Sequence, residues 1–228
     1  MDEGEVHAWF ATLEAAPEEI DRFRGLLAAD ELARADRFHF DRDRNRYIAG
    51  RGILRTLLAS YLRADAKALS FIYGEHGKPG LPAGDLRFNL SHSHGHALYA
   101  FTQGREIGCD IEMLRGDVLR ERIAERFFSP AETAALMALP PQQRTQGFFN
   151  CWTRKEAWIK ARSHGMSIPL DSFDVTLAPG EPARLLAVRP DVAEASRWTL
   201  HALDAPEGFA AAIAVEGEPV RIVARDFT

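Results

Sequence analysis

Residues 86–112 read LRFNLSHSHGHALYAFTQGREIGCDIE, and this segment indicates the fold more clearly than any other part of the chain. It contains three short apolar runs, at 86–90, 97–101 and 106–112. A polar stretch separates the first two runs, and the Gln103-Gly104 turn precedes the third. Short apolar runs bounded by turn residues predict β-strands, so we expect hairpin-like strands here.

Helical patterns lie on both sides of these strands. Apolar residues recur at helical spacing in five segments: 17–38, 41–63, 118–128, 129–139 and 145–162. Four further strand-like runs follow, at 172–177, 198–202, 209–215 and 220–224. Each half of the chain thus has one or more helices and hairpin-like strands. This order predicts an α+β fold of two similar lobes that meet near residue 112.

The composition excludes several classes of protein. The chain has 228 residues, a net charge of −5, 46% hydrophobic residues and two cysteines, Cys109 and Cys151. It is therefore neither disordered nor a disulfide scaffold, and its sparse cysteines fit a reducing compartment. No segment approaches the ~20 apolar residues of a membrane helix, and the acidic N-terminus does not resemble a signal peptide. We expect a soluble cytoplasmic protein with no membrane or nucleic-acid partner.

The segment Ile107–Glu112 combines a strand pattern with two carboxylates. Side chains alternate along a strand, so Asp110 and Glu112 share one face while Cys109 and Ile111 share the other. Paired carboxylates beside an apolar face suit a hard cation with oxygen ligands. A solvated strand face explains the same pattern without any metal.

Further downstream, Glu156 and Lys160 are four residues apart and share a helix face. They form either part of a site or a simple stabilising ion pair. Glu132 follows Ser129 by three residues, with proline between them, which fits an N-terminal capping box as well as a catalytic role.

Several residues are suited to bind phosphate. Ser91 and His92 lie at a predicted strand end. His94 and His96 follow them and raise the alternative of zinc, but a tight zinc site needs a fourth ligand that is not nearby in sequence. Arginines recognise phosphate through bidentate hydrogen bonds. The candidates are Arg42, Arg44, Arg46, Arg51 and Arg55 on one predicted helix, with Lys78 in a glycine-rich loop, and a solvated helix face is the alternative for the arginines.

Taken together, these segments resemble the 4′-phosphopantetheinyl transferases of the Sfp type. They occur in the family's order and span residues 46–173: Arg46-Tyr47 with Gly50 and Leu54-Arg55, Gly77-Lys78-Pro79, Phe88 to Ser93, Gly108 to Glu112, Phe127-Phe128-Ser129 with Glu132, Trp152 with Lys155-Glu156-Ala157 and Lys160, and Ser167 to Phe173. One segment alone means little, but all seven in order are specific to the family.

The chain departs from the family in two places. Upstream of Phe38, the lysine-rich run that often contacts a coenzyme A phosphate is replaced by Glu31 and Asp36, with only Arg34 and Arg37 as basic residues. Arg51 is a candidate to compensate, although it lies about 140° round the helix from Arg46. The second departure is in 162–166, which keeps only one of two usual glycines.

The resemblance implies a pseudo-symmetric monomer of two α+β lobes, 1–112 and 113–228. Each lobe is a small antiparallel sheet packed with helices, and the active site lies in the cleft between them. Such enzymes transfer the 4′-phosphopantetheine arm of coenzyme A to a serine of an acyl or peptidyl carrier protein and release adenosine 3′,5′-bisphosphate. The cofactor is Mg²⁺, with Mn²⁺ as an alternative. Whether the carrier serves fatty-acid, polyketide or nonribosomal peptide synthesis stays open.

The resemblance also implies roles for individual residues. The metal ligands are Asp110, Glu112 and Glu156. The residues that bind coenzyme A are Arg46, Arg51, Lys78, Ser91, His92, Asp110, Lys155 and Lys160. The catalytic residues are Glu156, Lys160 and Glu132; the base is Glu156, Glu132 or a metal-bound water. Basic and apolar residues in 114–128, including Arg120 and Arg122, are expected to dock the carrier protein.

Two other functions fit part of this pattern. One is a non-catalytic module that binds coenzyme A or a carrier and regulates synthesis; the complete set of three acidic residues favours the enzyme instead. The other is a magnesium-dependent coenzyme A pyrophosphohydrolase, which only dependence on a carrier serine distinguishes from the transferase.

Overall fold

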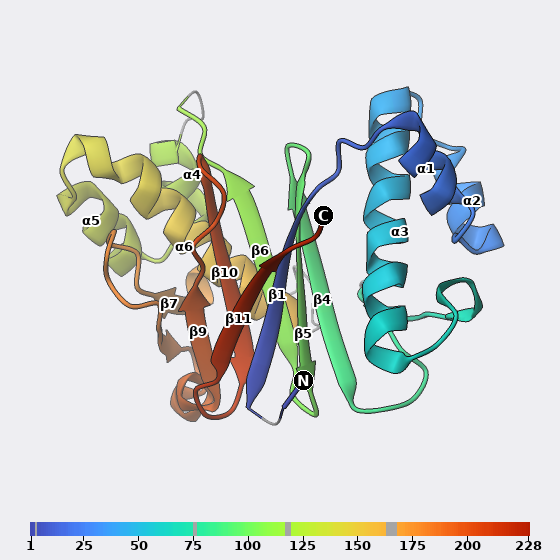
Figure 1. Ribbon diagram of the computed structural model, residues 1–228. Coiled ribbons are helices and arrows are strands. Elements are labelled where there is room, and N and C mark those ends of the chain that lie inside the picture. The colour runs from blue at the N-terminus through green and yellow to red at the C-terminus, as the bar shows by residue number, and fades with distance from the viewer. Residues whose placement is uncertain (3, 75–76, 117–119, 163–167) are drawn as a thin grey trace.

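Two sheets stand face to face at the centre of the molecule (Figure 1). The structure is a computed structural model that describes residues 1–2, 4–74, 77–116, 120–162 and 168–228. The first sheet has the order β11-β1-β5-β4 and the second β6-β10-β9. Their strands are β1 (Glu5–Thr12), β4 (Leu86–Ser93), β5 (His96–Gln103), β6 (Ile107–Met113), β9 (Trp198–Ala202), β10 (Phe209–Glu216) and β11 (Arg221–Asp226).

Helices cover the outer face of each sheet, so the predicted α+β class is confirmed. On one side lie α1 (Pro17–Arg24), α2 (Ala29–Ala35) and α3 (Asp41–Leu62), and on the other α4 (Arg120–Phe127), α5 (Pro130–Ala138) and α6 (Pro141–Arg162). Smaller elements complete the chain: η1 (Ala66–Ala68), β2 (Ile72–Tyr73), β3 (Pro79–Gly80), η3 (Leu170–Ser172), β7 (Phe173–Val175), β8 (Leu185–Val188) and η4 (Val192–Arg197).

Three apolar clusters hold these layers together. Between the sheets, β1 and β5 bury residues such as Phe10 and Leu98 against Ile107, Cys109 and Ile111 of β6. A second cluster joins the first sheet to α3, and a third joins the second sheet to α6. The alternation predicted for β6 is confirmed, since its apolar side chains enter the inter-sheet core while Asp110 on the opposite face contacts Lys160 of α6.

The elements differ from the sequence prediction in several respects, and the short strands β2, β3 and β8 were not predicted. The single helix expected at 17–38 is two helices, α1 and α2. The strand β1 was not predicted, although it lies in the middle of the first sheet. The last strand, β11, pairs with β1 in parallel, so that sheet is not wholly antiparallel. The boundary between lobes at residue 112 stays a prediction, and β11 is the one strand from the second half of the chain in the first sheet.

None of the described helices is long and apolar enough to span a lipid bilayer.

At Gly108 the backbone of α6 lies against β6 with no room for a side chain. A Cβ atom at Gly108 would lie 2.1 Å from the carbonyl oxygen of Ala157 and 2.3 Å from the amide nitrogen of Ala161. Both are backbone atoms of α6, so they cannot move aside as a flexible side chain would. The glycine therefore lets the helix that carries Glu156 and Lys160 lie directly on the strand that carries Asp110.

We expect Gly108→Ala to lower the free energy of unfolding by about 2–3 kcal/mol, because the added methyl group forces α6 away from β6. Thermal unfolding and transfer activity measure the two consequences. For thermal unfolding, Gly116→Ala is the matched control, since a Cβ atom there has no neighbour within 4 Å. An unchanged melting temperature for Gly108→Ala would contradict the close approach.

Candidate active site

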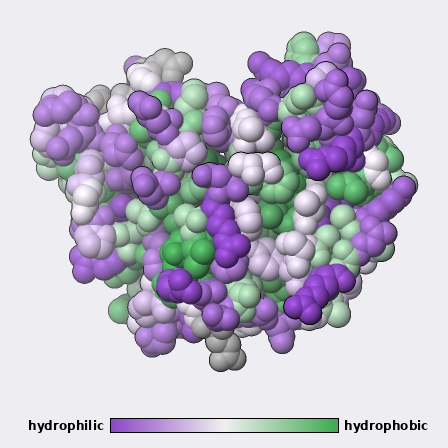
Figure 2. Space-filling model, viewed as in Figure 1, coloured by the Kyte–Doolittle hydropathy of each residue, from purple (hydrophilic) through white to green (hydrophobic). Residues whose placement is uncertain are grey.

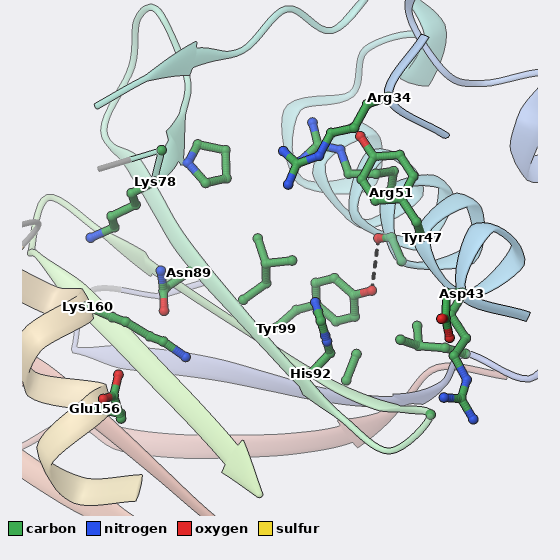
Figure 3. A pocket seen from close by; sticks show the side chains of 18 of the residues that line it. Arg34, Asp43, Tyr47, Arg51, Lys78, Asn89, His92, Tyr99, Glu156 and Lys160 are labelled. Carbon is green, nitrogen blue, oxygen red and sulfur yellow. Dashed lines mark hydrogen bonds between the residues drawn. The ribbon is translucent and has the colours of Figure 1, made fainter. Parts of the chain in front are cut away.

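A cleft of about 730 Å³ lies between the two helical flanks and collects most of the predicted site residues. Figure 3 shows Glu156 and Lys160 reaching it from α6, Lys78 from the loop before β3, and Arg51 from α3 on the opposite side. Six predicted residues line this one cleft: Arg46, Arg51, Lys78, His92, Glu156 and Lys160. Figure 2, in the view of Figure 1, shows hydrophilic side chains on both helical flanks and a mixture of hydrophobic and hydrophilic residues between them.

Strand β4 forms a row of hydrogen bonds to β6 beside this cleft. Asn89 Oδ1 accepts from the amide nitrogen of Cys109 at 2.9 Å. Two residues further, Ser91 Oγ donates to Asp110 Oδ1 at 2.7 Å, and Ser93 Oγ donates to Glu112 Oε2 at 2.7 Å. Because side chains two residues apart share a strand face, one face of β4 orients both carboxylates.

Lys160 adds a positive charge to this row. Its Nζ donates to Asp110 Oδ1 at 2.6 Å and to Ser91 Oγ at 2.9 Å. Burial by itself lowers the pKa of Lys160, but the Asp110 carboxylate, together with Cys109 and Glu156, outweighs that effect and the net pKa is raised. The ammonium group is therefore charged where it meets the cleft.

Two further carboxylates, Glu156 and Glu112, lie near Asp110, and the three repel one another. The pKa of Glu156 is raised, first by burial and then by the charges of Asp110 and Glu112. The pKa of Glu112 is also raised, chiefly by burial and further by Asp110, although its bond from Ser93 opposes the shift. Asp110, Glu112 and Glu156 therefore lie close enough to repel one another. A bound cation would reduce this repulsion.

The structure supports part of a metal site. Asp110 Oδ2 is buried and has no hydrogen-bond partner, so one lone-pair-bearing oxygen is left over beside two other carboxylates. Within the described residues, however, no three or more acidic, histidine or cysteine side chains are grouped closely enough to hold an ion as they stand. The three carboxylates have the donor chemistry that Mg²⁺ prefers, and holding an ion requires them to turn toward one another.

Comparison with known proteins agrees with this arrangement. Residues 106–214 match the 4′-phosphopantetheinyl transferase superfamily, and residues 12–103 match the N-terminal part of a 4′-phosphopantetheinyl transferase. The 4′-phosphopantetheinyl transferase HetI of Nostoc sp. is 41% identical over 219 residues, which cover 93% of this chain and 88% of the relative. The chain belongs to the 4′-phosphopantetheinyl transferase superfamily. The predicted family is thus confirmed.

Two Bacillus subtilis enzymes are similar to this phosphopantetheinyl transferase over a shorter range. A 4′-phosphopantetheinyl transferase is 38% identical over 160 residues, and the 4′-phosphopantetheinyl transferase Sfp is 35% identical over 161 residues. Each alignment covers 70% of this chain and 70% of the relative. The predicted Sfp type and the assignment as an enzyme are therefore confirmed as well.

Five residues predicted for the active site of this transferase do not line its cleft. Ser91 and Asp110 accept hydrogen bonds from Lys160, which does line it, and Glu112 lies two residues from Asp110 on β6. Lys155 and Glu132 lie elsewhere, in the interior. Lys155 is fully buried and Glu132 is 2% exposed, and the Lys155 Nζ and Glu132 Oε2 atoms form an ion pair at 2.8 Å. Lys155 also donates to the carbonyl oxygens of Leu170 and Phe173. Direct contact of Lys155 with coenzyme A, and proton abstraction by Glu132, do not fit these positions.

Glu132 has a structural role instead. It forms the predicted capping box with Ser129, since its Oε2 accepts from the Ser129 amide at 2.9 Å and its own amide donates to Ser129 Oγ at 3.2 Å. Its Oε1 accepts from the Val175 amide at 2.8 Å. One carboxylate thus joins α5, α6 and β7.

Several basic residues of the cleft have internal hydrogen-bond partners. Arg46 Nε donates to Glu14 Oε1 at 2.8 Å, and Lys78 Nζ donates to the carbonyl oxygen of Ile107 at 3.0 Å. Burial lowers the pKa of Lys78. Desolvation, and then the charge of Lys160, lower the pKa of His92. An anion that binds Arg46 or Lys78 therefore either replaces these internal hydrogen bonds or forms additional ones beside them.

Sequence reasoning assigned no role to several residues that shape the site. Arg34, Tyr47 and Tyr73 line the cleft, while Asn89 and Ser93 carry the hydrogen bonds from β4 to β6. Asn89, Ser91 and Ser93 are two residues apart on β4 and share one strand face. This period of two was the sequence signal that could have indicated their common role. Tyr73 comes from a short strand with no pattern that indicated a binding role.

We expect Glu156→Gln to stabilise the metal-free transferase at neutral pH, because it removes one charge from three crowded carboxylates. A gain of about 1 kcal/mol raises the melting temperature by about 2–4 °C in a chain of this size. The raised pKa of Glu156 means that the folded state binds a proton more tightly than the unfolded chain, so the wild type loses stability as the pH rises through that pKa. The gain should shrink to nothing below the ordinary glutamate pKa of 4.5.

Thermal unfolding in EDTA across a pH series measures this effect. Glu207→Gln, which changes an exposed glutamate outside the cleft, is the control. A gain that is the same at all pH values would contradict the repulsion.

Proposed function

We propose that this enzyme transfers the 4′-phosphopantetheine arm of coenzyme A to a serine of an acyl or peptidyl carrier protein, in a Mg²⁺-dependent reaction that releases adenosine 3′,5′-bisphosphate. The observation that carries the proposal is a cleft with arginines on one wall and Lys160 with Glu156 on the other, where Lys160 is hydrogen-bonded to Asp110. This distribution of charge suits a ligand with several phosphates and a divalent cation.

The cleft has the size and charge for such a ligand. Its volume of about 730 Å³ lies within the range of small-molecule sites. Arg34, Arg46 and Arg51 line one side, and Lys78 and Lys160 line the other. Because guanidinium groups form paired hydrogen bonds to phosphate, the arginine side suits a phosphate of the adenosine part, and the lysine side suits the pyrophosphate.

Asp110, Glu112 and Glu156 are the residues that would hold Mg²⁺. A bound magnesium ion supplies positive charge that stabilises the phosphoryl oxygens and the departing phosphate. The unpartnered Oδ2 of Asp110 and the raised pKa values of both glutamates support this assignment.

The transfer step exchanges one P–O bond for another. The oxygen of the carrier serine bonds to the β-phosphorus of coenzyme A, and the bond from that phosphorus to the bridging oxygen breaks. Adenosine 3′,5′-bisphosphate leaves with the electron pair of that bond. Lys160 faces this end of the cleft with a charged ammonium group and can stabilise the developing negative charge.

Glu156 is our choice for the base that takes the serine proton. It lines the cleft beside Lys160, at the end where we place the pyrophosphate. Glu132 is unsuited because it is buried and already bound to Lys155, Ser129 and Val175.

We assign carrier docking to segment 114–128. Arg122 and Arg126 are exposed there, and the Arg126 guanidinium lies 5.2 Å from the centre of the partly exposed Phe127 ring. Basic and apolar groups suit an acidic carrier, with charge setting the rate of encounter. Residues 117–119 of this segment lie outside the described residues, and so does the side chain of Arg120.

We also infer a monomer that acts in the cytoplasm. One chain supplies every residue of the cleft named above, so no second copy is needed to complete it. Both cysteines are buried thiols, as suits a reducing compartment.

Intact-protein mass spectrometry of an apo carrier incubated with the enzyme, coenzyme A and Mg²⁺ tests the proposal. We expect the carrier to gain one phosphopantetheine, and the gain to disappear when EDTA replaces Mg²⁺. Hydrolysis of coenzyme A without a carrier would instead indicate a pyrophosphohydrolase. Binding of coenzyme A with no modification of several acyl and peptidyl carriers would indicate a regulatory module.

A further inference from the structure

Glu31 is a buried carboxylate that binds two arginines. It lies on α2 with 1% of its surface exposed. Its Oε1 is paired with Arg51, and its Oε2 accepts from Arg55 Nε at 2.6 Å and from the Ala28 amide at 2.8 Å. Both carboxylate oxygens are therefore in use, and the side chain is held from several directions.

Arg55 anchors this arrangement away from the cleft. It is 1% exposed, and its Nη1 donates to the carbonyl oxygens of Ala66 and Leu69 at 2.8 and 3.0 Å. Its guanidinium lies 5.1 Å from the centre of the Phe71 ring. With these bonds made to the protein, Arg55 has no part in the cleft and serves to fix Glu31.

Arg51 is the member of the group that faces the cleft. It lies 4.5 Å from the centre of the same Phe71 ring, and its Nη2 donates to the Tyr73 hydroxyl at 3.2 Å. Arg51 and Tyr73 both line the cleft. So does Arg34, which follows Glu31 on α2, and Figure 3 shows Arg34 and Arg51 at the same end.

We propose that Glu31 is a positioning residue that holds Arg51 in the cleft wall to bind an anionic group of coenzyme A. The inference rests on the proposed function, because it assumes that coenzyme A occupies this cleft. Glu31 acts through Arg51 and does not itself line the cleft.

The number of charges explains why this arrangement suits an anion. One carboxylate pairs with two guanidinium groups, so the group keeps a net positive charge, and Arg51 presents it to the cleft. A long arginine side chain loses rotamer freedom when it binds, and this loss opposes binding. Glu31 and the Phe71 ring restrict Arg51 before the ligand arrives, which lowers that cost.

Positioning and simple electrostatics predict opposite results for Glu31→Gln. The negative charge of Glu31 by itself opposes a bound anion, so its removal would leave binding unchanged or make it tighter. If Glu31 instead positions Arg51, its removal frees the guanidinium and weakens binding. The sign of the change therefore distinguishes the two.

The test is isothermal titration of the full chain with coenzyme A, for the wild type, Glu31→Gln, Arg51→Met and the double variant. We expect Glu31→Gln to raise the Kd about tenfold, in the range of one charge-assisted hydrogen bond. In the Arg51→Met background we expect Glu31→Gln to change the Kd less than about twofold, because Glu31 then has no arginine to position.

Glu194→Gln is the matched control. Glu194 is also a buried carboxylate with two arginine partners, Arg162 and Arg197, but it does not line the cleft. We expect its Kd for coenzyme A to stay close to that of the wild type. Steady-state kinetics should show that Glu31→Gln raises KM for coenzyme A by a larger factor than it changes kcat.

Each outcome has one meaning. If Glu31→Gln binds coenzyme A as tightly as the wild type or more tightly, the inference is overturned. Equal losses with and without Arg51 would also overturn it, since they indicate a general structural role. If circular dichroism shows that Glu31→Gln is unfolded, Glu31→Asp, which keeps the charge but shortens the side chain, takes its place in the same cycle. A wild type that does not bind coenzyme A contradicts the proposed function itself.

Discussion

Asp110→Asn is expected to lower kcat for phosphopantetheinyl transfer by about 10³-fold, the largest effect on activity that the structure indicates. Asp110 accepts hydrogen bonds from Ser91 and Lys160 through Oδ1 and offers an unpartnered Oδ2. Asparagine keeps the shape of the side chain but removes the charge that balances Lys160 and would attract a cation. The variant therefore loses charge complementarity with little change in packing.

Mass spectrometry of the carrier protein measures the loss of transfer. Titration with Mn²⁺ should show weaker metal binding, a readout that does not depend on turnover. Asp174→Asn is the matched control, because Asp174 is also paired with a cation, but that cation is Arg189, which does not line the cleft as Lys160 does. Normal turnover of Asp110→Asn at saturating Mg²⁺ would show that the metal and reaction site is elsewhere.

Lys155→Met is expected to have the largest effect on stability, about 3–5 kcal/mol, because it leaves the buried Glu132 carboxylate without its cation. The Lys155 Nζ also lies 4.1 Å from the centre of the Phe173 ring, and that contact is lost too. In a chain of this size such a loss lowers the melting temperature by about 10 °C.

The double variant Glu132→Gln/Lys155→Met separates structure from chemistry. Removing both charges avoids an unpaired buried carboxylate, so we expect the double variant to melt at a higher temperature than Lys155→Met alone. At a temperature where the chain is folded, it should retain transfer activity, since neither residue lines the cleft and the bonds described for both reach no residue that does. A double variant that is fully folded but inactive would show that Lys155 or Glu132 takes part in catalysis.

The two lysines of α6, Lys155 and Lys160, show how well the helical period predicts the position of a side chain. Glu156 and Lys160 are four residues apart and share a helix face, as predicted, and both line the cleft. Lys155 is five residues from Lys160, about 140° round the helix, so the same helical period places it on another side. That signal was present in the sequence, but family resemblance suggested a cleft position, which the structure contradicts.

Arg46 and Arg51 show the opposite case. They too are about 140° apart on α3, yet both line one cleft. Arg46 is held by Glu14 and Arg51 by Glu31, and each partner is more than 15 residues away in sequence. No local period indicates where these acidic partners lie, so the positions of the two guanidinium groups were not predictable.

The period of two along β6 is a local property, and it was enough to place Asp110 and Glu112 on one face and Cys109 and Ile111 in the core. The order of helices and strands likewise predicted the α+β class. The partners of the charged residues depend on contacts between segments distant in sequence. Burial of Lys155 with Glu132, the parallel pairing of β11 with β1, and the Glu31 group behind Arg51 are therefore properties of the tertiary structure.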